Sequence, residues 1–63
     1  MERFELEQLA TRIIDYRGKH DLTQRAFAKM CKVHRDTILR IENLSASPSR
    51  LTVAKINLIL NAE

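Results

Sequence analysis

Residue types that build cross-links and metal sites are scarce in this sequence. It has no tryptophan, and only one cysteine, one glycine and one proline among 63 residues. The single Cys31 cannot form an intramolecular disulfide, which fits a reducing compartment, and it is too isolated to indicate a metal site. We therefore interpret Cys31 as a small buried hydrophobic residue.

Longer patterns are missing as well. No apolar run approaches the length of a membrane-spanning helix, and no signal-peptide pattern opens the chain. There is no glycine-rich phosphate loop, and no pair of acidic, histidine or cysteine residues has the spacing of a catalytic site. We expect a cytoplasmic protein that is not an enzyme and that uses no cofactor and no metal.

A chain of this length corresponds to one domain, residues 1–63, with a small core and modest stability. Its formal net charge of +3 is unevenly distributed. Residues 1–16 hold four acidic and two basic side chains, whereas residues 17–40 hold seven basic and two acidic ones. A positive field centred on residues 17–40 fits a polyanionic partner.

Hydrophobic periodicity predicts an all-α fold without strands. We expect four helices, over residues 5–17, 24–31, 35–43 and 50–60, with five short helices as the alternative. Gly18 is the natural point for the first helix to stop, because glycine tolerates a left-handed backbone. The last helix begins either after Ser49, which has cap spacing to Thr52, or at Ser47-Pro48, with proline at the first helical position.

Residues 22–42 organise this pattern, because they predict a helix, a tight turn and a second helix. Thr23 is a suitable N-cap, and Leu22 and Phe27 then have the spacing of a hydrophobic staple. The second helix has an apolar inward stripe of Val33, Ile38 and Ile41. Its outward face carries side chains that donate to or accept from base edges, namely His34, Arg35, Asp36 and Arg40. This is the layout of a helix-turn-helix, whose second helix lies in a DNA major groove.

The stretch resembles the lambda-repressor-like family, also called XRE or Cro-type. The resemblance covers roughly residues 5–60 and rests on the joint spacing of Arg17, Leu22-Thr23-Gln24, Ala28, Val33, Arg35, Thr37-Ile38, Arg40-Ile41-Glu42, Pro48-Ser49, Thr52 and Lys55-Ile56. It implies a compact lambda-repressor-like DNA-binding domain. Lys32 stands where the family usually has glycine, so we expect Lys32 to hold a left-handed backbone. Cys31 replaces a larger aliphatic residue, and the chain has no room for the family's fifth helix.

Two sets of DNA contacts follow. Base contacts are expected from His34, Arg35, Asp36 and Arg40, and Arg35 is the strongest candidate because its planar fork bonds both O6 and N7 of guanine. The alternative for Asp36 is a carboxylate that stabilises the helix dipole, and for His34 a turn residue. Phosphate contacts are expected from Thr23, Gln24, Lys32, Thr37, Asn43, Ser47, Ser49 and Arg50. The resemblance also implies a structural ion pair between Arg17 and Glu42.

The last predicted helix carries two apolar stripes, although a helix in so small a domain needs only one facing the core. The inward stripe is Val53, Ile56 and Leu60. The second stripe, Leu51, Ala54 and Leu58, is a candidate dimer interface. We therefore expect a homodimer, weak without DNA, on a two-fold-related operator of double-stranded DNA.

The sequence thus predicts a small Cro-type transcriptional regulator, bacterial or phage-encoded and nucleoid-associated, that represses by occupying its operator. The main alternative is the antitoxin half of a toxin–antitoxin pair, which holds a protein toxin and binds DNA to autoregulate its operon. A domain cut from a longer regulator is a further alternative. A helical module that binds only protein is disfavoured by the basic face.

Overall fold

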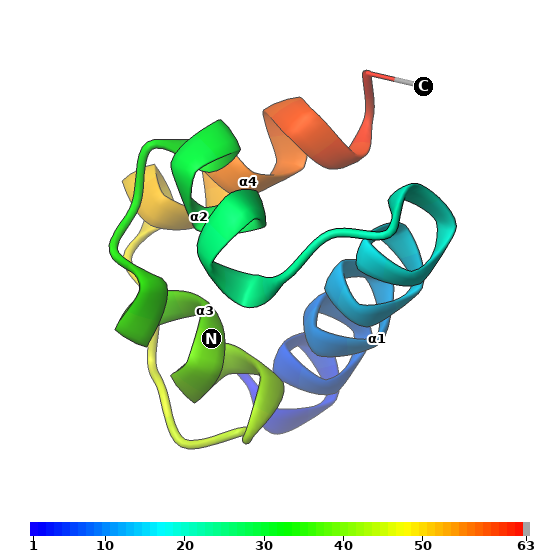
Figure 1. Cartoon of the computed structure of the whole chain (residues 1–63). Helices are drawn as coiled ribbons and strands as arrows, with labels where there is room; N and C mark the ends of the chain where they lie inside the picture. Colours follow the sequence, from blue (N-terminus) through cyan, green and yellow to red (C-terminus); the bar gives the residue numbers. More distant parts are fainter. Residues whose placement is uncertain (63) are drawn as a thin grey trace.

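Four helices make up residues 1–62, the part of the chain that the computed structural model describes (Figure 1). They are α1 (Arg3–His20), α2 (Gln24–Cys31), α3 (Arg35–Glu42) and α4 (Arg50–Leu60). No strand occurs within these residues, which confirms the all-α class. Figure 1 shows α1 along one side of the molecule, with α2, α3 and α4 gathered beside it. The predicted domain of residues 1–63 includes Glu63, which lies outside the described residues.

The bounds of α2 and α4 agree with the sequence prediction, and α3 ends one residue earlier, at Glu42. The start of α1 lies at Arg3, two residues before the predicted one. Among residues 1–62 no helix is both long and apolar enough to cross a membrane.

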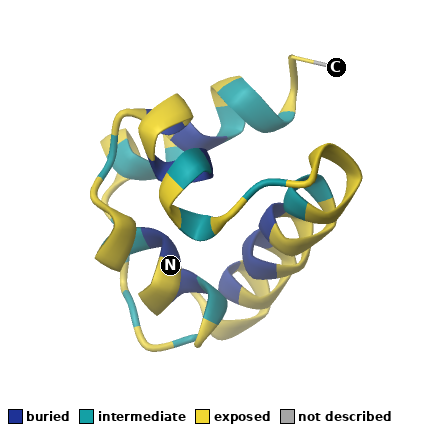
Figure 2. Cartoon of the chain, viewed as in Figure 1, coloured by how far each residue is buried: buried dark blue, intermediate teal, exposed yellow. Residues whose placement is uncertain are grey.

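Each helix contributes to a single core, and in Figure 2 the buried segments face the interior of the molecule. The largest side chains with no exposed surface are Ile13, Phe27, Ile38, Ile41 and Ile56. Cys31 is buried among them, as predicted. Burial raises the pKa of the Cys31 thiol from 9.0 to about 11, because the thiolate would lose its hydration. Cys31 is therefore a neutral core residue at physiological pH.

The end of α1 differs from the prediction. Gly18 does not stop the helix, which continues through His20. Asp21 makes the turn instead, and its φ of 55° lies in the left-handed region. The backbone amide of Leu22 donates to the carbonyl oxygen of Arg17 at 2.8 Å, and the Leu22 side chain packs against the core. Docking of Leu22, rather than the freedom of the glycine, therefore fixes where α1 ends.

The same C-terminal turn closes α2 and α3. Lys32 and Leu44, which follow these helices, both have a φ of 60°. The amide of the next residue donates five residues back in each case, from Val33 to the Ala28 carbonyl at 3.0 Å and from Ser45 to the Arg40 carbonyl at 2.8 Å. This is the hydrogen bond of a Schellman motif. The predicted left-handed backbone at Lys32 is confirmed.

Side-chain hydrogen bonds cap the N-terminal ends of α2, α3 and α4. The acceptors are Thr23 Oγ1, His34 Nδ1 and Ser49 Oγ, and the donors are the backbone amides of Ala26, Asp36 and Thr52, at 3.0, 3.0 and 3.2 Å. The predicted Thr23 cap is confirmed. Of the two starts considered for α4, the one after Ser49 is correct and the one at Ser47-Pro48 is wrong, because the Ser49 hydroxyl supplies the cap.

Candidate nucleic-acid interface

The inward sides of α2 and α3 pack against each other through small and aliphatic residues. Ala28 and Cys31 of α2 are almost fully buried, and Ile38 and Ile41 of α3 have no exposed surface. The short side chain of Ala28 lets the backbones approach. The turn between the two helices contains Lys32 in its left-handed conformation. Since one face of α3 is fixed in the core, the opposite face is held rigidly toward solvent.

That outward face carries the predicted base-contacting residues. Arg35, Asp36 and Arg40 are exposed, and His34 lies just before the first turn. Positions 36 and 40 are one helical turn apart and share one side of the helix. His34 uses its Nδ1 atom to accept the amide hydrogen of Asp36, and the same Nδ1 lies 3.8 Å from Asp36 Oδ2. This leaves Nε2 of His34 as the ring atom available to a ligand.

A shallow depression of about 280 Å³ lies where the first turns of α2 and α3 meet. Arg25, His34 and Arg35 line it. Arg25 was absent from the sequence-predicted contacts, although it contributes to the basic charge of residues 17–40. Its position directly after Gln24, in the first turn of α2, is the signal that would have identified it. The depression combines cationic side chains with the amide ends of two helices, an arrangement that favours anions.

An ion pair joins Arg17 of α1 to Glu42 of α3. The Arg17 guanidinium donates through Nε to Glu42 Oε2 at 2.9 Å and through Nη2 to Glu42 Oε1 at 2.8 Å. Arg17 Nη1 also donates to the carbonyl oxygen of Leu22 at 3.1 Å. The side chains are 22% and 8% exposed for Arg17 and Glu42, respectively, so the pair is largely shielded from water.

Gln24 completes this network, which the sequence did not indicate. Its Nε2 donates to Glu42 Oε1 at 3.1 Å. An amide group carries two hydrogens, so one remains for a ligand at the N-terminus of α2. Gln24 is thus oriented by the ion pair rather than free on the surface.

Apart from Arg50, the remaining phosphate candidates lie in three different settings. Lys32 and Asn43 are exposed directly after α2 and α3, and Ser47 is exposed in the loop before α4. Thr23 and Ser49 are exposed but use their hydroxyl oxygens as helix caps. Thr37 is only half-exposed, on the first turns of α3.

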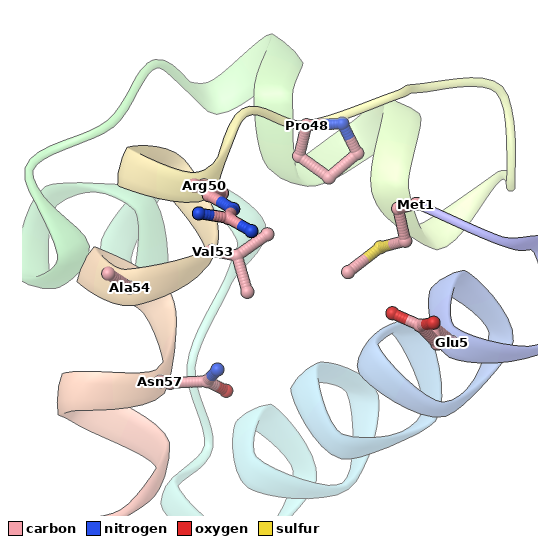
Figure 3. A pocket seen from close by; sticks show the side chains of 7 residues that line it. All are labelled: Met1, Glu5, Pro48, Arg50, Val53, Ala54 and Asn57. Carbon is pink, nitrogen blue, oxygen red and sulfur yellow. The ribbon is translucent and has the colours of Figure 1, made fainter.

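Arg50 lies elsewhere, on a groove between α1 and α4 of about 460 Å³ (Figure 3). The figure shows Met1 and Glu5 on the α1 side of this groove, opposite Arg50, Val53 and Asn57 from α4. Ala54 lines the same groove.

The second apolar stripe of α4 is exposed. Leu51 and Leu58 are 66% and 74% exposed, and Ala54 lies between them. On the other side of the helix, Ile56 is fully buried and Val53 packs against the core. The structure therefore separates the two stripes in the way that the sequence predicted.

The fold and this basic face define a DNA-binding domain of the helix-turn-helix class. A family model described as helix-turn-helix matches residues 13–63, and the protein belongs to this family, which is of the XRE or lambda-repressor-like type. Membership supports sequence-specific DNA binding by a regulator of transcription, and the family is not normally enzymatic. Comparisons with curated proteins and with solved structures gave no significant match.

Proposed function

We propose that the protein is a Cro-type repressor that binds an operator with α3 in the major groove. The observation that carries this proposal is the exposed face of Arg35, Asp36 and Arg40, held in place by the buried residues on the other side of α3. The mechanism is steric, because a domain that occupies an operator excludes polymerase. A cytoplasmic location is part of the proposal, since a bacterial or phage regulator must reach the chromosome.

Within this proposal the contacts divide into reading and positioning. Arg35 reads guanine through its bidentate fork, and Asp36 accepts a hydrogen bond from a cytosine amino group or orients a neighbouring arginine. Arg40 lies further along α3 and reaches a base or a phosphate, while Nε2 of His34 contacts the edge of the groove. Phosphates bind the second amide hydrogen of Gln24 and the exposed Arg25, which fixes the register of α3 without reading sequence.

The other phosphate contacts surround this centre. They are Thr23, Lys32, Thr37, Asn43, Ser47, Ser49 and Arg50, of which Arg50 reaches DNA only if its flexible side chain leaves the groove beside α1. The contacts of Lys32 and Arg50 add affinity that falls as salt concentration rises, because positively charged side chains release counterions from the DNA.

We infer that two copies bind together through α4. Leu51 and Leu58 project on either side of the small Ala54, so a second copy related by a two-fold axis near Ala54 meets the same side chains. The groove beside Ala54 provides space for a leucine of the partner. Such a dimer presents two α3 helices to sites one turn of DNA apart, roughly 34 Å. The interface is small, so the free dimer is weak.

A second candidate function is that of an antitoxin, in which the protein also holds a toxin. The supporting observation is Phe4, an aromatic residue near the start of α1 that is 67% exposed. An exposed aromatic residue fits a protein partner. This candidate predicts a stoichiometric second protein after expression of the native operon and mild purification, whereas a simple repressor is recovered alone.

The test of the main proposal is selection of bound fragments from a pool of random duplex DNA. We expect enrichment of one motif, repeated in inverted orientation with centres about one helical turn apart. Random fragments after several rounds, with weak binding that disappears at raised salt, would contradict sequence-specific recognition.

A further inference from the structure

One large apolar side chain lies on the polar face of α3. Leu39 is 39% exposed and directly follows Ile38, which has no exposed surface. It lies three and four residues after Asp36 and Arg35, so these three residues are neighbours on the helix surface. The predicted base-contacting residues therefore surround an apolar position that the sequence analysis did not single out.

The exposure of Leu39 is not explained by the core. The apolar residues that flank α3, Val33 and Leu44, both pack against the core, whereas Leu39 remains exposed. Nor does Leu39 belong to the exposed stripe of α4, which lies on a different helix. The exposed part of the Leu39 side chain can be removed from water only by contact with an apolar group of a binding partner.

The major groove offers one such partner. Of the four bases, only thymine places a methyl group there, on C5, beside the hydrogen-bonding atoms of the base pair. Leu39 shares the outward surface of α3 with Arg35 and Asp36, the side chains proposed to meet base edges. We propose that Leu39 reads the C5-methyl group of a thymine, next to the base pairs read by Arg35 and Asp36. This inference rests on the proposed function, because it requires α3 to lie in the major groove.

The inference specifies a part of the operator that arginine and aspartate cannot read. Uracil pairs as thymine does and presents the same hydrogen-bonding atoms, but it lacks the C5-methyl group. Replacing thymine by deoxyuridine therefore removes the methyl group proposed to contact Leu39 and leaves the hydrogen-bonding atoms in place. Loss of one buried methyl-sized group corresponds to a fall in affinity of about three- to fivefold.

The experiment uses the duplex obtained by selection from random DNA, and a set of duplexes in which each thymine in turn is replaced by deoxyuridine. With the unaltered protein, we expect one position in each half-site at which the replacement weakens binding about three- to fivefold. With Leu39→Ala, the unsubstituted duplex binds weaker by a similar factor, and the deoxyuridine duplex binds as well as the thymine duplex.

Two further variants make the test decisive. Leu39→Gln keeps a long side chain without the apolar end, and it must also lose the preference for thymine. Met30→Ala removes another exposed apolar side chain, 41% exposed and on α2, and it must keep that preference. Thermal melting of each variant verifies that it is folded.

The outcomes separate this inference from the proposed function. If the protein selects a duplex but Leu39→Ala discriminates thymine from deoxyuridine as the unaltered protein does, the inference is overturned and DNA recognition stands. If no duplex is selected, DNA recognition fails and the inference fails with it.

Discussion

At the scale of single residues, Lys32 holds a conformation that most side chains avoid. Its φ of 60° and ψ of 41° are left-handed, at a cost of roughly 1–2 kcal/mol relative to an ordinary helical residue. The fold tolerates this cost because the following amide, on Val33, satisfies the Ala28 carbonyl and because Val33 packs against the core.

Lys32→Gly should therefore stabilise the domain. We expect a gain of up to about 1 kcal/mol, since relief of the strained backbone exceeds the entropy that glycine adds to the unfolded chain. DNA binding should weaken slightly, because one phosphate contact is lost. Lys29→Gly is the matched control, since Lys29 is also exposed but lies inside α2, and it should destabilise by about 1 kcal/mol. Urea unfolding gives the free energy of unfolding of both variants. Equal destabilisation by Lys32→Gly and Lys29→Gly would contradict a strained backbone at Lys32.

Sequence reasoning found residues whose role depends on local geometry and missed those whose role depends on the fold. The left-handed Lys32 and the cap at Thr23 follow from short-range rules. The bond from Gln24 to Glu42 joins residues 18 positions apart and requires α2 and α3 to be placed first. Leu39 was missed because it is a single apolar residue on the outward face of α3, whereas the outward apolar residues of α4 recur as a stripe.

At the scale of helices, the Arg17–Glu42 pair connects three elements. Arg17 comes from α1 and Glu42 from the last turn of α3, while Gln24 adds the first turn of α2. The pair has bidentate geometry and little exposure, so removal of one partner leaves a poorly solvated charge. The network fixes the orientation of α3 relative to the rest of the domain.

Glu42→Ala should lower the free energy of unfolding by about 2–3 kcal/mol, somewhat below the range for fully buried pairs because Arg17 retains some exposure. Glu7→Ala is the control, since Glu7 pairs with Arg3 at 3.7 Å on the exposed surface of α1 and contributes under about 1 kcal/mol. Chemical denaturation gives both values. A Glu42→Ala variant as stable as Glu7→Ala would show that the network does not hold the helices together.

Helix positions were largely predictable, and helix ends were less so. The periodic apolar residues and the predicted caps at Thr23 and Ser49 led to the correct bounds for α2 and α4. The predicted end of α1 was wrong, because it relied on the tolerance of Gly18 for a left-handed turn. In the structure Asp21 adopts that turn, and the reason is a tertiary one, the packing of Leu22 against the core.

At the scale of the whole molecule, the proposed dimer depends on the arrangement of α3, which would contact DNA, and α4, which would contact the second copy. Leu51, Ala54 and Leu58 are exposed on one side of α4, where the exposed Lys55 lies between the two leucines. In the proposed dimer, burial of the apolar side chains between two copies would couple occupation of the two half-sites.

Leu58→Lys should abolish cooperative binding to an operator with two half-sites, because it places a charged side chain in an apolar interface. Folding and binding to an isolated half-site should remain nearly unchanged, since Leu58 is 74% exposed. Ile14→Lys, which places the same charge at an exposed apolar position of α1, should keep the cooperativity. Band-shift titration measures the cooperativity of DNA binding, and sedimentation measures the association of two copies. Cooperative binding by Leu58→Lys would place the interface elsewhere, with Phe4 and the start of α1 as the next candidates.

The central claim is that α3 reads base sequence, and the most direct measurement compares Arg35→Ala on the selected duplex and on a scrambled duplex of equal length, at one salt concentration. Lys19→Ala removes the same charge from the end of α1 and controls for overall charge. We predict that Arg35→Ala loses about 1–3 kcal/mol on the selected duplex, with relaxed preference at one base pair, and loses much less on the scrambled one. An equal loss on both duplexes would show that Arg35 contacts only phosphate and would contradict the claim.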